Sequence, residues 1–122
     1  MGPRVFQIGY DPTLMRVREL LLAQNGYSVA SACGNAEAYR LLAEEAPFDV
    51  FFVARCTTYG ERKAIVLWLK QRWPAVRVVA IHDSFQRSIP GADVTANHDT
   101  TAEWLAAVAA ATGPFGSAGD SA

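Results

Sequence analysis

Short runs of apolar residues alternate along the chain with longer stretches in which apolar residues recur every three or four positions. The short runs are rich in β-branched and aromatic residues, as strands are, and the longer spacing is typical of helices packed on one side. The strands are expected at residues 4–9, 27–31, 49–54, 76–82 and 93–96. This alternation predicts an α/β domain with a parallel sheet that is covered by helices on both faces.

Capping residues and prolines mark the bounds of four predicted helices. Asp11 followed by Pro12 is a helix start, because a carboxylate accepts the first free N–H groups and proline has no N–H to leave without a partner. The helices are expected at residues 12–24, 35–46, 61–73 and 100–111. Their inward faces are expected to carry Leu14, Val17, Leu20 and Leu21, with Ala23 at the margin; Ala38, Leu41 and Leu42; Ile65, Val66, Leu69 and Trp73; and Trp104, Leu105 and Val108.

One connection in this pattern is short. Only the segment DSFQRSIPGA, residues 83–92, separates the fourth and fifth predicted strands. A crossover between parallel strands normally needs a dozen or more residues, usually as a full helix. The helix between these two strands is therefore expected to be shortened or absent.

Composition and charge narrow the class of protein. The chain has 122 residues, 51% of them apolar, which is enough for one core. Its 11 basic and 12 acidic residues nearly cancel, so the chain has no net electrostatic attraction to a polyanion or a membrane surface. We therefore expect no direct binding to nucleic acid or membrane. No apolar run approaches the length that crosses a bilayer, and Cys33 and Cys56 lack C-x-x-C spacing. A cytoplasmic protein with free, inert thiols is expected, and Arg62 with Lys63 is interpreted as a solvated helix face.

The order and spacing of four stretches carry a resemblance to a known family. They are RVFQIGYDPTLMRVRELLLAQNGYSV, DVFFVA, RWPAVRVVAIH and GADVTANHDT. Together they resemble the receiver domain of bacterial two-component response regulators. The resemblance implies a flavodoxin-like three-layer sandwich with five parallel strands in the order 2-1-3-4-5. It also implies a receiver-like domain over residues 1–112. Residues 113–122 are rich in Gly, Ser and Ala without periodicity and are expected to form a flexible linker, at the place where this family attaches an output domain, here of unidentified type.

The family's chemistry requires a set of side chains at the carboxyl ends of the strands, where ligands bind in open α/β sheets. Two acids after the first strand hold Mg²⁺, an aspartate ending the third strand accepts a phosphoryl group, and a hydroxyl after the fourth strand and a lysine after the fifth hold that group. By the resemblance, the corresponding residues here are Gly9 and Tyr10, Ala54, His82 and His98. Asp11 stands at a peripheral acidic position, and Thr95 stands where the family has an aromatic switch residue.

These departures exclude phosphorylation by the family's route. A methyl group forms no acyl phosphate, and a site without its carboxylates has little to hold an octahedral Mg²⁺ ion. We therefore expect an atypical receiver with a degenerate pocket, with no cofactor and no enzymatic activity. The chain also lacks the common phosphate-loop, dinucleotide, zinc-protease and nucleophile-elbow motifs.

The leading functional hypothesis is a phosphorylation-independent interaction domain in bacterial signalling or transcription control. Its partner is expected to be a second copy, forming a homodimer, or another signalling protein. In the family the dimer and output face lies beside the fifth strand, where a shortened connection would uncover apolar surface. Phe85, Ile89 and Trp104 are the candidate contact residues there, and packing in the core is the alternative for each.

A sensor of a small ligand or a metal ion is the second hypothesis. His82 and His98 leave neighbouring strands at one sheet edge, with Asp11, Asp83 and Cys56 as further candidate ligands. Two imidazoles with a carboxylate or thiolate suit Zn²⁺ or Cu²⁺. The residues are far apart in sequence, so no spacing motif supports the site, and unpaired histidines at strand ends are ordinary. A thiol enzyme that uses Cys56 near His82 is the weakest hypothesis, because no orienting acid accompanies the pair.

Overall fold

The computed structural model describes residues 3–42, 48–54, 58–82, 90–97 and 101–117. The strands are β1 (Arg4–Gly9), β2 (Ser28–Cys33), β3 (Val50–Val53), β4 (Arg77–His82) and β5 (Val94–Asn97). The helices are α1 (Pro12–Gln24), α2 (Asn35–Leu42), α3 (Tyr59–Arg72) and α4 (Thr101–Ser117). No helix in these ranges is long and apolar enough to span a membrane.

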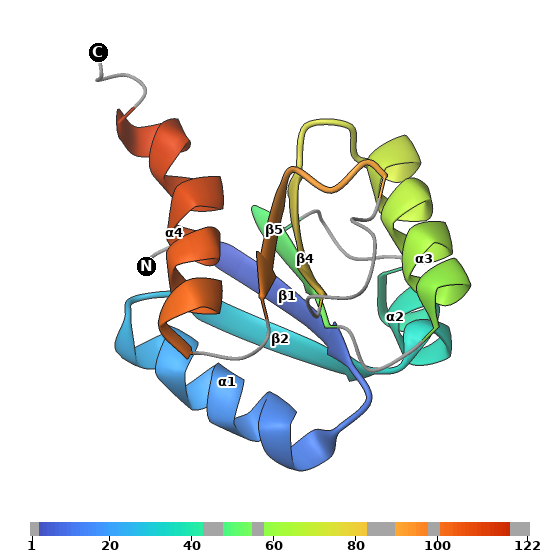
Figure 1. The fold of residues 1–122 in the computed structure, drawn as a ribbon, viewed down its shortest axis with the longest axis horizontal. Coiled ribbons are helices and arrows are strands. Elements are labelled where there is room, and N and C mark those ends of the chain that lie inside the picture. Colours follow the sequence, from blue (N-terminus) through green and yellow to red (C-terminus); the bar gives the residue numbers. More distant parts are fainter. Residues whose placement is uncertain (1–2, 43–47, 55–57, 83–89, 98–100, 118–122) are drawn as a thin grey trace.

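The strands form one parallel sheet in the order β2-β1-β3-β4-β5 (Figure 1). The register pairs Phe6 with Phe51 and Phe51 with Val78, so β1, β3 and β4 run level through the centre. All their carboxyl ends therefore lie at the same edge. The parallel, flavodoxin-like α/β architecture predicted from the sequence is confirmed.

Helices cover the sheet on both faces: α1 and α4 lie on one and α2 and α3 on the other (Figure 1). Strand residues alternate between two apolar cores, because successive side chains point to opposite faces. Phe6, Phe51 and Val78 belong to the core under α2 and α3, whereas Val5, Phe52 and Val79 belong to the core under α1 and α4. Every residue of β3 is buried, which explains its unbroken apolar run.

Helix α1 presents a different face to the core from the one predicted. Its buried residues are Met15, Arg18 and Leu22, while Leu14, Val17, Leu20 and Ala23 are exposed and Leu21 is half-buried. The expectation was wrong because the exposed side of the helix is also apolar, so hydrophobicity alone does not identify the inward side. Arg18 is accommodated there because its guanidinium lies over the rings of Phe52 and Trp104, at 5.3 and 6.0 Å.

The inward faces of the other helices agree with the prediction. Ala38, Leu42, Ile65, Val66, Leu69 and Val108 are fully buried, and Leu41, Trp73 and Leu105 pack against the cores while partly exposed. Helix α3 begins two residues before Glu61, because the Thr58 hydroxyl accepts the Glu61 N–H and caps the helix there.

Two expectations concern the carboxyl-terminal half. Helix α4 continues to Ser117, past the predicted start of the linker at residue 113. The Thr112 hydroxyl donates to the carbonyl oxygens of Val108 and Ala109, at 3.2 Å each, so its polar group is satisfied inside the helix. The domain boundary itself stays a prediction. The shortened connection concerns residues 83–92, of which 83–89 lie outside the described residues.

A buried amide joins β1, β2 and α1. Gln7, 0% exposed, donates from Nε2 to the Met15 carbonyl oxygen at 3.1 Å and to Ser31 Oγ at 3.0 Å. The Ser31 hydroxyl in turn donates to a Glu19 carboxylate oxygen at 2.6 Å. Gln7 Oε1 has no hydrogen-bond partner within the part of the chain that the structure describes. Polar groups of β1, β2 and α1 thus tie the edge strand β2 to the centre of the sheet.

An ion pair anchors the start of β5. Asp93 Oδ2 accepts hydrogen bonds from Lys70 Nζ at 2.9 Å and from the Val78 backbone N–H at 2.7 Å. Lys70 Nζ also donates to the Val76 carbonyl oxygen at 2.9 Å. The two charged side chains are only about a quarter exposed, at 25% and 27%. This cluster connects α3, β4 and β5.

Replacement of Asp93 by alanine is expected to lower the free energy of unfolding by about 2–4 kcal/mol, because it removes two hydrogen bonds to a charged acceptor and leaves Lys70 without its carboxylate. Arg16→Gln is the control, since the Arg16–Glu19 pair is 3.4 Å long and Arg16 is 71% exposed. That change should cost less than about 0.5 kcal/mol. Urea unfolding followed by circular dichroism measures both, and equal losses would contradict the anchoring role.

Candidate functional site

The carboxyl edge of the sheet brings together most positions that the sequence singled out. Gly9 ends β1, Ala54 directly follows β3 and His82 ends β4. The β4–β5 register pairs Ala80 with Thr95 and His82 with Asn97, so the ends of β4 and β5 lie side by side. The backbones of Gly9, Ala54 and His82 therefore share one edge of the sheet, and a pocket there stays a prediction.

The space beside Gly9 and Ala54 is filled by apolar atoms. Ala54 is 3% exposed, and its backbone N–H donates to the Ile8 carbonyl oxygen at 2.9 Å. A Cβ atom at Gly9 would lie 3.1 Å from Met15 Cγ, 3.3 Å from Met15 Sδ and 3.6 Å from Ala54 Cβ. Met15 itself is 6% exposed. A thioether and a methyl group thus occupy the place where a charged pocket would need polar side chains.

Tyr10 and Asp11 are engaged in local structure. Asp11 Oδ1 accepts the N–H groups of Thr13 and Leu14 at 3.1 and 3.2 Å, which confirms the predicted cap of α1. The Tyr10 hydroxyl accepts the Asn35 N–H at 3.1 Å, and its ring packs over Gly34, whose φ is +94°. The loop after β1 is therefore held against the start of α2.

These residues do not fit a Mg²⁺ ion. Magnesium requires near-octahedral coordination by oxygen atoms, usually with one or two carboxylates among them. Gly9 has no side chain, the Tyr10 oxygen accepts a backbone N–H, and the Asp11 carboxylate already accepts two. Among the described residues there is also no group of three or more His, Cys, Asp or Glu side chains placed to hold a metal.

Several predicted site residues lie outside the described part of the chain. These are Cys56, Asp83, Phe85, Ile89 and His98, together with the side chains of His82 and Thr95. The two-histidine metal site, the switch position and two of the three contact residues therefore stay predictions.

Trp104 is a core residue, which confirms its predicted place on the inward face of the last helix. The other interpretation, Trp104 as a contact residue of an interaction face, is wrong. Trp104 is 4% exposed, and its ring meets Phe52 edge-on at 5.4 Å between centroids. The alanine-rich sequence of α4 lets the helix approach the sheet closely, with Ala107 and Ala111 buried beside it. A tryptophan at helical spacing fills the space under such a helix.

A buried arginine at the same edge was missed by the sequence analysis, which placed Arg62 on a solvated face. Arg62 is 0% exposed, and its Nη2 donates to the Ile81 carbonyl oxygen at 2.6 Å, next to the end of β4. Its spacing from Ile65, Val66 and Leu69 is that of one helix face, which is the signal that identifies it. The guanidinium of Arg62 thus holds the carboxyl end of β4 through its hydrogen bond to Ile81.

Tyr39 on α2 lies near the same loops. Burial raises the pKa of its phenol, and charge repulsion of the Tyr39 phenolate by the Glu61 carboxylate and by an ionised Tyr10 raises it further. The Tyr39 ring packs edge-on against Trp68, with ring centroids 4.8 Å apart.

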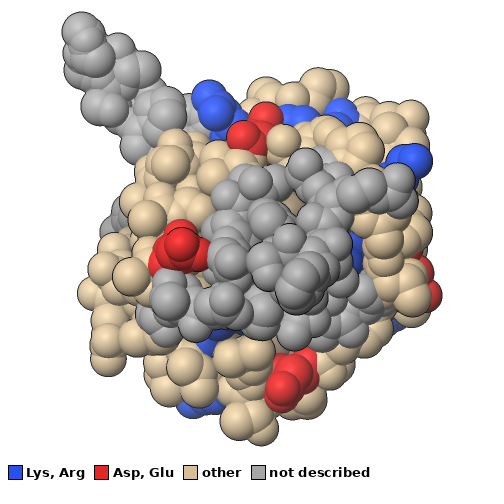
Figure 2. All heavy atoms as spheres, in the orientation of Figure 1, with Lys and Arg blue, Asp and Glu red and all other residues tan. Residues whose placement is uncertain are grey.

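On the face shown in Figure 2, charged residues of both signs are scattered among the described residues and do not gather into one patch. This distribution agrees with the near balance of 11 basic and 12 acidic residues in the sequence. The described part of this face therefore offers no basic surface for a polyanion.

No protein-family model and no curated protein matches the sequence. Solved structures do. A response regulator receiver domain protein from Clostridium thermocellum superposes with a TM-score of 0.81 at 20% identity, covering 94% of this chain and 98% of that one. The chain has the receiver fold.

The response regulator TrrA of Thermotoga maritima shares this fold in two further structures. In complex with Mg²⁺ and BeF it has a TM-score of 0.73 at 14% identity, covering 86% of this chain and 94% of its own. In complex with the histidine kinase ThkA the TM-score is 0.77 at 11% identity, covering 90% and 98%. Receiver domains of this fold thus occur in signalling proteins.

The position of Met15 in the receiver fold is testable by mutation. Met15→Ala is expected to lower the free energy of unfolding by about 2–5 kcal/mol, because it leaves a cavity beside Gly9 and Ala54. Leu14→Ala, one residue away and 43% exposed, should cost less than about 1 kcal/mol. Thermal or urea unfolding compares the two. A larger loss for Leu14→Ala would support the helix face predicted from the sequence instead.

Proposed function

We propose that this chain is an atypical receiver that accepts no phosphoryl group and acts as a protein-interaction domain in bacterial signalling. The observation that supports it is the apolar closure of the carboxyl edge, where Ala54 follows β3 and Met15 packs against Gly9. The TrrA structure holds Mg²⁺ and BeF, and the corresponding edge of this chain is proposed to take neither. It follows that the domain has one signalling state, which a kinase does not switch.

Protein interaction is favoured by the exposed side of α1. Four of the five large hydrophobic side chains that are exposed in the described part of the chain lie on this helix or just before it: Tyr10, Leu14, Val17 and Leu20, at 38%, 43%, 45% and 50% exposure. We call them the α1 patch. Apolar side chains gathered on one helix are a common feature of protein-binding surfaces. The fold also supports the role, since TrrA occurs in complex with a protein partner.

We expect that an aspartate introduced at position 54 alone does not make the chain accept a phosphoryl group. Ala54→Asp supplies a carboxylate but no second acid to hold Mg²⁺, because Gly9 has no side chain and Asp11 caps α1. The purified chain and this variant are incubated with acetyl phosphate and Mg²⁺ and examined by intact mass spectrometry, beside a receiver with an intact aspartate as positive control. Neither should gain a phosphoryl group. A label on the unsubstituted chain would overturn the proposal.

The α1 patch is expected to carry the binding energy of the interaction. Val17→Glu should weaken self-association or partner binding by about tenfold or more, since contact residues at the centre of interfaces contribute more than about 1 kcal/mol. Leu67→Glu is the matched control, because Leu67 lies on α3 and is 55% exposed. Light scattering over a range of concentrations measures self-association, and a binding assay with the identified partner measures the alternative. An equal loss of binding affinity for the two variants would exclude the α1 patch as the binding surface.

A further inference from the structure

The outer sides of α1 and α4 expose apolar side chains of two sizes on the same face of the sheet (Figure 1). Helix α1 carries the large ones, which are the helical members of the α1 patch: Leu14, Val17 and Leu20. Helix α4 carries small ones, which we call the alanine stripe and which are all exposed: Ala102, Ala106 and Ala109. One copy of the chain therefore presents both a raised and a shallow apolar surface.

The α1 patch lies on the side of α1 that turns toward α4. Successive residues of an α-helix are rotated by about 100°, so Val17 lies nearly opposite Glu19 around the helix axis. The Glu19 carboxylate accepts a hydrogen bond from Ser31 on the edge strand β2. Arg18, which lies between the two in sequence, points into the core and stands 6.0 Å over the Trp104 ring of α4. Val17 is therefore on the flank away from β2 and toward α4.

Two contacts fix the relative heights of the two helices. Near the middle of α1, Arg18 lies over Trp104, which is close to the start of α4. Just beyond the end of α1, the Tyr27 hydroxyl lies 3.4 Å from that of Thr112, two turns further along α4. The two helices therefore run in the same general direction, as expected for helices that connect parallel strands.

Charged side chains lie at the two outer margins of this apolar face. Arg16 is 71% exposed and pairs with Glu19 at 3.4 Å, so it lies at the margin away from α4. Glu103 is exposed and precedes Thr112 by nine residues, about two and a half turns, which sets the two on opposite sides of α4. Since Thr112 meets Tyr27 beside α1, Glu103 lies at the margin away from α1.

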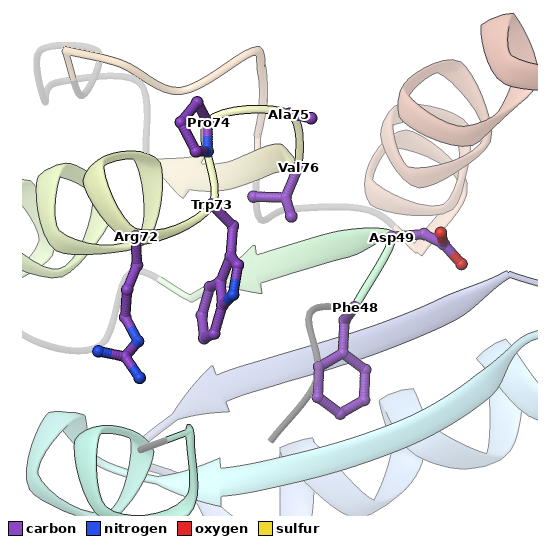
Figure 3. A pocket seen from close by; sticks show the side chains of 7 residues that line it. All are labelled: Phe48, Asp49, Arg72, Trp73, Pro74, Ala75 and Val76. Carbon is purple, nitrogen blue, oxygen red and sulfur yellow. The ribbon is translucent and has the colours of Figure 1, made fainter. Parts of the chain in front are cut away.

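The helices on the other face of the sheet are already engaged with their own core. A cavity opens at the end of α3 beside Trp73 and Phe48 (Figure 3). Both rings pack against the fully buried Phe51, which stacks on Trp73 at 14° and meets Phe48 at 68°. Among the described residues, Leu67 is the one large hydrophobic side chain that is exposed on that side. The apolar surface that remains to be covered is thus the face formed by α1 and α4.

We propose that a second copy of this chain covers this face, with α1 of each copy packed on α4 of the other. The inference rests on the proposed function and names the partner of the α1 patch. A two-fold axis that runs along the helices and between them exchanges their places and keeps their heights. The contact of Arg18 with Trp104 marks one height on both helices. Leu20 and Ala106 each lie two residues beyond it, so they meet across the interface.

Size and charge both favour this pairing over α1 on α1. Leucine and valine side chains fill the space above alanines, which gives the close packing that stable interfaces have. Two leucine faces would hold the copies apart and leave the alanine stripes uncovered. The same two-fold axis brings Arg16 to Glu103 of the second copy. Pairing α1 with α1 would instead set the two Glu103 margins against each other, and complementary charge selects the correct partner surface.

Sedimentation equilibrium of the unmodified chain tests the self-association. The mean mass should rise from 13.2 kDa toward twice that value between micromolar and millimolar concentrations. Ala106→Trp should weaken association by about tenfold or more, because the indole takes the place of Leu20 at the centre of the contact. Ala64→Trp changes an exposed alanine of α3 and should have no effect. A monomer over the whole range, or equal effects of the two tryptophans, would overturn the proposal.

Cross-linking identifies which helices meet. In a chain that carries Cys33→Ser and Cys56→Ser, one sample has Leu20→Cys and the other has Ala106→Cys. The two are mixed and treated with a short bis-maleimide, and the products are identified by mass spectrometry. The mixture should yield dimers with one chain of each kind, and Leu20→Cys alone should yield far fewer. More dimer from Leu20→Cys alone than from the mixture would contradict the exchange of α1 and α4.

Failure of this inference is distinguishable from failure of the proposed function. A chain that stays monomeric while Val17→Glu weakens its binding to a different protein would overturn the second copy as partner and keep the α1 patch as the binding surface. Loss of self-association with both Val17→Glu and Ala106→Trp, and with neither Leu67→Glu nor Ala64→Trp, would support both.

Discussion

Burial of β3 on both faces is the constraint on which the rest of the molecule depends. Its four residues, Val50 to Val53, are at most 2% exposed, and they alternate between the two cores. A strand in this position needs apolar side chains throughout and partners on both sides. The helices that cover it, the level register of β1 and β4, and the common carboxyl edge all follow from that requirement.

The same constraint explains how well the sheet was predicted. Runs such as RVFQIG and VRVVAIH are apolar and β-branched because their strands are covered on both sides, and β1 occupies the residues expected. The other strands shift by one or two residues, since a strand's ends depend on pairing with neighbours that the sequence does not show. The resemblance to receiver domains added the fold, and the solved structures support it at the level of the fold.

The helix faces were predicted less uniformly, for a physical reason. Where one side of a helix is apolar and the other polar, as in α2, the core residues Ala38 and Leu42 are evident. In α1 both sides are apolar, and the true inward face contains Arg18, which is buried against aromatic rings. Arginine is counted as polar in any pattern, yet its flat guanidinium packs on rings as an apolar group does. Arg62 escaped notice for the same reason.

The candidate sites were also predicted only in part. The resemblance to receiver domains predicts the acceptor position at Ala54, and the structure places Ala54 directly after β3. The capping role of Asp11 was predicted from the Asp11–Pro12 pair and is confirmed. The filling of the space by Met15 was not predicted, because it depends on which side of α1 turns inward. Trp104 had two interpretations, because a large aromatic residue suits both an interface and a core, and its burial decides for the core.

The buried amide of Gln7 has a consequence for how the edge strand assembles. Ser31 is its side-chain partner on β2, and the neighbours of Ser31 in that strand are Ala30 and Ala32. Sliding β2 by a single residue would move the Ser31 hydroxyl away and leave the amide of the fully buried Gln7 without its side-chain acceptor. A misaligned edge strand is thus less stable than the native one, so this single hydrogen bond favours the native register of β2.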